Sequence, residues 1–240
     1  MFNTLKNITM RKTILTIFIL FMLSSLSFSQ DLYELRKAID FYKTQKLFKD
    51  DWKDILTEND IKGSPYLNDE FINGTLFTTN KFQFIDIPIR YNIFNDQIEY
   101  KTENNQIQAI ANPEILERIE FADKRIVYIP FLIANKTNKG FFIVLEEGKA
   151  SLYAKPQVVF IKATLPVPFK DGQPAKFDRT TDQYYIKTGI EVAKSVGNIK
   201  ELIEIFPENK DKIEAFIKTK KTKTNKPESL KELVRYYNSL

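Results

Sequence analysis

The chain has 240 residues and a formal net charge of +5, and it contains neither cysteine nor histidine. The absence of cysteine excludes disulfides, thiolate nucleophiles and zinc ribbons. The absence of histidine removes the usual general base at neutral pH and the commonest metal ligand, so Ser-His-Asp triads and histidine-based metal sites are excluded.

The mature chain is predicted to be almost neutral. Lys6, Arg11 and Lys12 lie in a predicted leader, and without them the basic residues outnumber the acidic ones by only two. So small an excess does not indicate binding to nucleic acid or to an anionic membrane. The sequence contains no Gly-rich phosphate loop, and we expect no cofactor.

Residues 1–29 have the layout of a secretory signal peptide. The three basic residues precede an apolar run, Ile14–Leu23, and Ser27 and Ser29 fit the small-residue positions before a cut. An uncleaved membrane anchor is the competing interpretation, but the run is shorter than the roughly 20 residues that span a bilayer. We therefore expect export to the periplasm or the cell surface, with membrane contact only through an uncleaved leader.

The first mature segment, residues 31–60, is predicted to be helical. Its apolar residues recur at helical spacing with Lys and Asp between them, which favours one or two amphipathic helices packed on a sheet. Trp52, the single tryptophan, is interpreted as a core anchor. Gly63-Ser64-Pro65 ends the helical pattern and opens an extended region.

The stretch Lys81–Lys101 is predicted to be a β-hairpin around which the sheet is organised. Apolar residues alternate from Ile85 to Ile93, which is typical of a half-buried strand. Phe82 and Phe84 fall in the opposite phase, so we expect a bulge near Phe84-Ile85. Pro88 favours an edge strand or an interrupted ladder, and Asn95-Asp96 supplies the turn. Two strands without mutual pairing are the alternative.

Residues 63–193 read as short strands separated by turns, which favours an antiparallel β-meander curled into a barrel or half-barrel. Turns are expected at residues 103–105, 138–140 and 146–149. The apolar runs Phe141–Leu145 and Val158–Ile161 should be central and covered on both faces. Residues 165–178 should form an irregular loop that crosses the sheet. Besides the hairpin, the expected strands are Phe71–Thr78, Gln106–Ile110, Arg118–Phe121, Arg125–Phe131, Phe141–Glu146, Ala150–Lys155, Val158–Ala163, Tyr184–Lys187 and Ile190–Ala193.

About three helices are expected in residues 198–239. Asn198 is a plausible N-cap for the first, Pro207 starts the second, and Pro227 with Glu228 opens the third. An apolar stripe along them indicates that they dock on the sheet. The fold class is thus α+β, with residues 30–240 forming one domain.

Several residues are candidates for a binding surface. Adjacent tyrosines could place one ring outward, because neighbouring residues on a strand point to opposite faces. A basic cluster around residues 218–226 could contact phosphate or an anionic polymer, although lysines at a helix end also simply complement the helix dipole. The candidate surface comprises Tyr184, Tyr185, Arg90, Tyr91, Lys220, Lys221 and Lys223.

The acids nearest the hairpin are Asp69, Glu70, Asp86 and Glu99. A glycosidase needs two carboxylates facing each other across a cleft, and such a pair could arise among them. With 31 acids in the chain, some approach one another by chance. A catalytic role is therefore the least favoured interpretation.

Several strings together carry a family resemblance. They include Gly63–Phe71, Ile87–Glu99, Gly140–Phe142 with Leu145–Lys149, and the ending Leu233–Leu240; Pro174–Phe177 and Tyr184–Ile186 agree with them. The chain resembles a family of exported proteins of Gram-negative bacteria that has no assigned activity, over nearly the whole mature chain. The resemblance implies an envelope location and adds no catalytic residue.

These observations favour a non-enzymatic envelope protein that binds an envelope protein, a lipid or a glycan through its curved sheet. A structural or assembly subunit is the first alternative, and a carboxylate-based hydrolase of envelope polysaccharide is the second. The interior of the sheet separates a carrier from a scaffold, because a lipid carrier needs an enclosed apolar cavity. An interior filled by Phe and Tyr side chains would exclude the carrier.

Overall fold

The structure is a computed structural model that describes residues 61–164 and 172–240. These residues belong to one compact unit that begins at Glu58. The predicted signal peptide, the predicted helical segment 31–60 and part of the predicted loop 165–178 lie outside the described residues.

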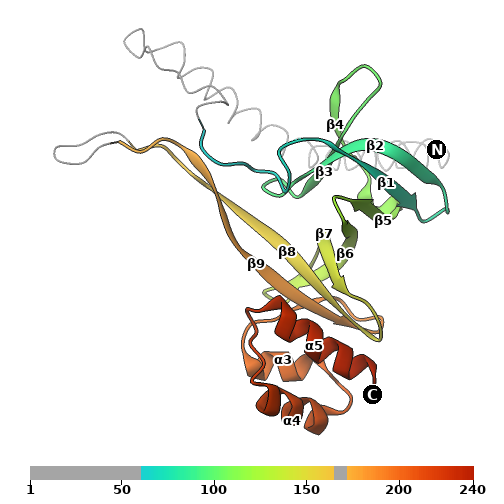
Figure 1. Ribbon diagram of the computed structural model, residues 1–240, viewed down its shortest axis with the longest axis vertical. Helices are drawn as coiled ribbons and strands as arrows, with labels where there is room; N and C mark the ends of the chain where they lie inside the picture. Colours follow the sequence, from blue (N-terminus) through green and yellow to red (C-terminus); the bar gives the residue numbers. More distant parts are fainter. Residues whose placement is uncertain (1–60, 165–171) are drawn as a thin grey trace, which may run out of the picture. The chain divides into compact units, whose positions relative to one another are not determined.

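The described residues form a ten-stranded antiparallel sheet followed by three helices (Figure 1). The strand order is β10-β9-β8-β7-β6-β5-β1-β2-β3-β4, so the meander is broken once, where β1 lies between β5 and β2. The predicted curled antiparallel sheet with helices at its C-terminal end is confirmed. The strands are β1 (Ile72–Thr78), β2 (Gln83–Asn92), β3 (Gln97–Lys101), β4 (Ile107–Ala109), β5 (Leu116–Phe121), β6 (Lys124–Ile133), β7 (Lys136–Glu146), β8 (Ala150–Ile161), β9 (Lys176–Thr188) and β10 (Lys194–Ser195).

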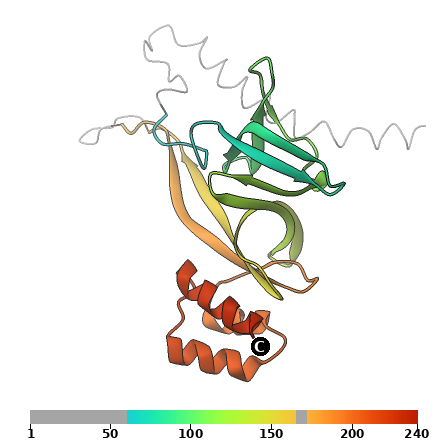
Figure 2. The same ribbon diagram turned by 45° about the vertical axis from the view of Figure 1, so that its right-hand side comes forward.

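Strands β6 to β10 curl until the chain before β10 returns to β6 (Figure 2). The amide of Leu132 donates to the carbonyl of Ala193 at 3.0 Å, and the amide of Ala193 donates to the carbonyl of Pro130 at 3.1 Å. Both backbone groups of Ala193 are thereby paired with β6. We call strands β6–β10 the curl.

The inside of the curl is filled by aromatic rings. Phe142 is fully buried and packs edge-on against Phe131 and Tyr185, with ring centroids 5.0 Å away in both cases. Tyr153 completes the cluster. Edge-to-face packing suits the ring quadrupoles, and four large side chains occupy the space that a lipid carrier would keep open.

A second and larger core lies on the opposite face of the same strands. Along β7 the side chains alternate, so Phe142 faces the curl while Phe141 and Ile143 face the larger core. Leu152 of β8 and Ile186 of β9 join the latter. The prediction that Phe141–Leu145 is central and covered on both faces is supported by the burial of its first three residues.

The C-terminal helices α3 (Ile199–Ile205), α4 (Lys210–Lys220) and α5 (Pro227–Asn238) cover this larger core. Asn198 caps α3 as predicted, because its side chain accepts the amide of Glu201 at 3.0 Å and donates back to that carboxylate. Pro227 begins α5, whereas α4 begins at Lys210 rather than at Pro207. None of the described helices combines the length and apolar composition that crossing a bilayer requires.

The hairpin is confirmed, with the predicted change of phase. Gly74 pairs with Ile87 and Leu76 pairs with Phe84, so Ile85 and Asp86 together oppose Thr75 and form a bulge. Asp86 adopts a positive φ of 57°, which Asp tolerates better than most residues. The bulge turns Phe84 to the same face as Ile87.

The expectation for Pro88 is only half right. Strand β2 is an interior strand between β1 and β3, not an edge. Its ladder with β3 nevertheless ends at Ile89, so Pro88 lies one residue beyond the last of those pairs. The missing N–H thus falls where the ladder is already interrupted.

Several boundaries were predicted wrongly. The turn expected at residues 138–140 lies instead at Ala134-Asn135, where φ is 46° and 64°, as a two-residue hairpin turn requires. Ile190–Ala193 is not a strand, and Ile190 is fully exposed. The two strands expected in residues 150–163 are one, β8, with an irregularity between Lys155 and Gln157.

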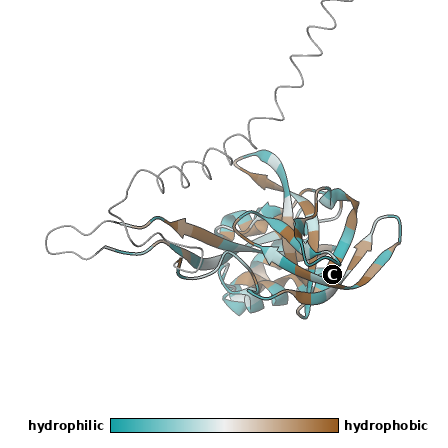
Figure 3. Cartoon of the chain, turned by 90° about the horizontal axis from the view of Figure 1, so that it is seen from above, coloured by the Kyte–Doolittle hydropathy of each residue, from teal (hydrophilic) through white to brown (hydrophobic). Residues whose placement is uncertain are grey.

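The far end of the β8–β9 hairpin also differs from expectation. Val159 and Ile161 are exposed, so the apolar run Val158–Ile161 is not covered on both faces. Figure 3 shows apolar stretches along this hairpin near the grey loop. Ile161 pairs with Lys176, which means that the described part of residues 165–178 continues a hairpin and does not cross the sheet. Only one face is protected there, where Phe160 packs against Phe177.

Candidate functional site

Arg90, which was predicted to belong to the binding surface, interacts with other side chains of the same protein. Its guanidinium donates twice to Glu99, at 2.6 and 3.2 Å, and lies 3.5 Å from the centre of the Tyr66 ring. Phe71 lies against it as well. With cation–π contacts and a bidentate ion pair made internally, Arg90 holds residues 66–71 on the hairpin and offers little to a ligand.

Tyr91 is fully buried, so its assignment to a binding surface is wrong. Its hydroxyl donates to Asp96 at 2.7 Å, and Asp96 also accepts from the ammonium of Lys155 at 2.9 Å. Burial and the neighbouring carboxylate raise the pKa of Tyr91, whereas burial lowers the pKa of Lys155 against the opposing pull of Asp96. We call these three side chains the buried triad.

Gly140 makes the buried triad possible. A Cβ on this glycine would stand 2.5 Å from the Asp96 carboxylate and 2.8 Å from the Lys155 ammonium. The ammonium of Lys155 lies 4.7 Å from the centre of the Phe142 ring, so the triad closes the aromatic interior of the curl with a polar layer.

The expected outward ring of Tyr184 or Tyr185 is also not found, because both residues are buried. Tyr185 points into the curl and donates its hydroxyl to Gln183 at 3.0 Å. Tyr184 points to the other face, where burial raises the pKa of its phenol and the charges of Asp182 and Glu228 add to the rise. The two faces were predicted correctly, but both are covered.

The predicted acids and the basic cluster lie apart. Glu99 has both oxygens engaged, by Arg90 and by Asn92, which leaves it unsuited to proton transfer. Lys220, Lys221 and Lys223 are exposed at the end of α4 and in the loop that follows. Lys220 lies 3.9 Å from Glu232, but within the described ranges Lys221 and Lys223 form no ion pair.

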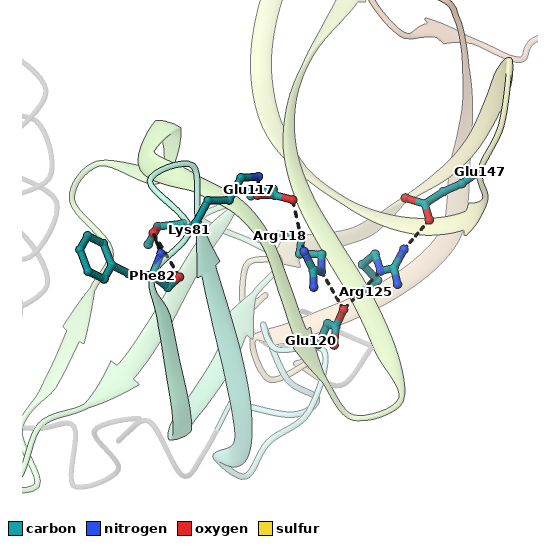
Figure 4. A network of polar contacts seen from close by, with 8 residues as sticks. Lys81, Phe82, Glu117, Arg118, Glu120, Arg125 and Glu147 are labelled. Atoms are coloured by element: carbon teal, nitrogen blue, oxygen red, sulfur yellow. Dashed lines mark hydrogen bonds and ion pairs between the residues drawn. The ribbon is translucent and has the colours of Figure 1, made fainter.

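A ladder of alternating charges follows the outside of β5 and β6 (Figure 4). Glu117 bonds Lys81 at 2.7 Å, Arg118 bonds Glu120 at 2.8 Å, and Arg125 bonds Glu147. Lys81 beside Glu117 lowers the pKa of that carboxyl. Each charge has a partner of opposite sign, so the ladder carries no free charge for a ligand, and exposed pairs of this kind add little stability.

The best candidate for a binding site is a shallow open hollow of about 320 Å³ between β9 and the loop that joins α4 to α5. We call it the polar hollow. Its walls come from four segments, which lie on β8, on β9, directly after β10 and in the loop between α4 and α5, and Tyr184 and Val196 supply its apolar part. The lining residues are Gln157, Thr181, Asp182, Gln183, Tyr184, Val196, Gly197, Thr224 and Asn225.

The polar hollow is rich in side chains with free hydrogen-bonding capacity. Among residues 61–164 and 172–240, the structure gives no hydrogen-bond partner to five lining side chains. These are Gln157, Thr181, Tyr184, Thr224 and Asn225. They provide hydroxyl and amide groups that both donate and accept, and none of them carries a charge at neutral pH.

Its one acid is already neutralised. Asp182 accepts from the guanidinium of Arg179 at 2.6 Å, and Arg179 also donates to the carbonyl of Gln157 at 3.0 Å. The hollow therefore presents a nearly uncharged lining, and no group of three or more metal-ligating acids occurs in the described part of the chain. Such a lining can hold a hydroxyl-rich or amide-rich ligand but has no evident acid–base pair.

Sequence reasoning found Tyr184 but missed the other lining residues. Thr181, Asn225 and Gln157 are common polar residues without motif spacing; the pairing of β8 with β9 brings Gln157 and Thr181 together, and the docking of the helices adds Asn225. The single signal was the polar string Thr-Lys-Thr-Asn-Lys between two apolar helices. Comparison with protein-family models, with curated proteins and with solved structures found no match.

Proposed function

We propose that the protein is an exported, non-enzymatic binding module of the cell envelope, and that the polar hollow is its binding site. The predicted signal peptide supports export, and the absence of His and Cys supports a role without catalysis. The observation that carries the proposal is the group of five polar side chains in the hollow that have no partner among the described residues.

The filled curl supports a ligand held at the surface rather than inside the sheet. Phe142 and Tyr185 are almost completely buried in the place where a carrier would have its cavity. A lipid tail would have to displace several closely packed rings, each of which contributes to stability. We therefore do not propose a lipid or small-molecule carrier.

Chemical-shift mapping tests this proposal. The isotope-labelled protein is titrated with the soluble glycans and peptides released by enzymatic digestion of a bacterial cell envelope. We expect shifts at the amides of Thr181, Gly197 and Asn225, and we expect their loss in a Gln157→Ala, Asn225→Ala double variant. Glu204→Ala, a change at an exposed position on α3, serves as the control. Shifts confined to other surfaces, or none, would contradict the proposal.

A second candidate function, an assembly subunit, is favoured by the apolar tip of the β1–β2 hairpin. Phe82, Phe84 and Ile85 are 67%, 54% and 63% exposed, and they follow one another closely at the start of β2. Neighbouring exposed apolar residues of this size are typical of contact surfaces. Cross-linking from position 84 in the native envelope would yield a defined adduct if this tip assembles with a partner, and no adduct if it does not.

A further inference from the structure

We infer that the polar hollow takes a segment of an acidic polysaccharide; this inference rests on the proposed function and specifies its ligand. The hollow would bind the hydroxyl groups of one or two sugar rings, while the lysines at its rim would meet the carboxylate or phosphate groups of the same chain. Neither feature alone indicates this ligand, but their adjacency does.

The lining fits a sugar because its free groups are neutral and bidirectional. Gln157 and Asn225 each carry an amide that donates and accepts, and Thr181 and Thr224 carry hydroxyls. A sugar ring offers the same mixture of donors and acceptors on every side. A site that leaves such groups without partners gains specificity when a hydroxylated ligand pairs with them.

The hollow also offers a small apolar area beside these polar groups. Tyr184 and Val196 are buried residues that reach its surface, and the carboxylate of Glu201 lies where a Cβ of Gly197 would be. One face of a sugar ring is made of C–H groups and is weakly apolar. The part of Tyr184 that reaches the hollow can contact that face, and its hydroxyl, which has no partner among the described residues, can bond to the sugar.

The charges at the rim select for a negative ligand. Lys223 and Lys226 flank the two lining residues Thr224 and Asn225 directly in the sequence, and both are exposed. Within the described residues neither forms an ion pair. Glu228 follows in α5 and is close enough to act on Tyr184, while Asp182 is paired with Arg179. The anionic groups of a bound polysaccharide could therefore form ion pairs with the ammonium groups of Lys223 and Lys226.

The test compares two soluble probes of equal length, an oligogalacturonate and a malto-oligosaccharide, by titration calorimetry of the purified chain at low and at physiological ionic strength. We expect the acidic probe to bind more tightly, with an affinity that falls as salt rises. A Lys223→Ser, Lys226→Ser double variant should weaken the acidic probe about tenfold and leave the neutral probe unchanged, because two partly screened contacts of this kind together contribute about that factor.

The matched control removes two lysines from the opposite end of α4. Lys210 and Lys212 are exposed, and neither lines the hollow. A Lys210→Ser, Lys212→Ser variant should change the affinity for either probe less than twofold. Circular dichroism and melting curves confirm that both double variants are folded before binding is measured.

The outcomes separate this inference from the proposed function. Equal or tighter binding of the malto-oligosaccharide, or an unchanged affinity in the Lys223→Ser, Lys226→Ser variant, would overturn the inference. If neither probe binds while the envelope digest still shifts the amides of the hollow, the ligand is not an acidic polysaccharide but the binding module stands. If the digest shifts no amide there, the proposed function fails too.

Discussion

Two neighbouring residues of β9 lie in two different regions of the molecule: the interior of the curl, which is closed, and the polar hollow, which is open. Tyr185 lies among the rings of the curl, where its hydroxyl has a partner and its ring has no contact with solvent. Tyr184 faces the polar hollow, where the structure gives its hydroxyl no partner among the described residues. The difference shows that the aromatic side chains inside the curl stabilise the fold, whereas the polar side chains that line the hollow are available for a ligand.

The largest expected loss of stability comes from removing an aromatic ring from the interior of the curl. Phe142→Ala removes a fully buried ring from the centre of the aromatic cluster, so we expect the free energy of unfolding to fall by about 3–5 kcal/mol. Urea denaturation measures it. The control is Ile190→Ala at a fully exposed position, which should stay within about 0.5 kcal/mol of the wild type. A small loss in Phe142→Ala would mean that the curl is loosely packed.

The buried triad closes the same region and should give the next largest effect. Asp96→Ala leaves the Lys155 ammonium, which is 13% exposed, without its carboxylate, and we expect a loss of about 2–3 kcal/mol. Thermal and urea unfolding measure it. Adding Lys155→Met removes the unpaired charge, so the double variant should recover much of the loss. No recovery would show that the two side chains are not coupled.

Alkaline pH should weaken the closed region through its tyrosines. The raised pKa of Tyr91 means that the folded protein keeps a proton which the unfolded chain loses near pH 10, so stability is present below that pH and falls above it. The expected loss is about 1.4 kcal/mol per pH unit for this group. Unfolding measured from pH 9 to 11 should show a smaller slope in Tyr91→Phe, and an equal slope would contradict the assignment.

The smallest expected effect is the difference in stability between variants of Tyr184 and Tyr185. Tyr185→Phe removes the hydrogen bond to Gln183 and should cost about 1 kcal/mol. Tyr184→Phe removes a hydroxyl that has no partner among the described residues, so its stability should stay within about 0.5 kcal/mol of the wild type. Parallel denaturation curves measure both. A larger loss in Tyr184→Phe would show that its hydroxyl is already engaged.

Local rules were enough to predict the hairpin and the cap of α3. The change of phase between Phe84 and Ile85 predicted the bulge. Side chains alternate along a strand, so an extra residue is needed to bring Phe84 to the same face as Ile87. Asn198, a residue type that favours the N-cap position, predicted the start of α3 in the same manner. In both cases the residues that decide the structure are close in the sequence.

The rest depended on contacts between distant residues. Gly140 looked like a turn residue, but it lies where the side chain of Asp96 from the β2–β3 turn and that of Lys155 from β8 approach the backbone. Val158–Ile161 looked like a buried strand, yet it lies at the end of a hairpin with one open face. The polar hollow is complete only after the C-terminal helices dock, because the loop between α4 and α5 supplies part of its lining.

Gly140 also carries a consequence for the evolution of this chain. A Cβ there would stand 2.5 Å from the carboxylate of Asp96 and 2.8 Å from the ammonium of Lys155, so a larger residue at position 140 requires these side chains to shift. In related sequences we expect a larger residue at position 140 only where position 96 has lost its acid or position 155 its lysine. The residue type at position 140 should therefore correlate with an ion pair between two residues that are 59 positions apart.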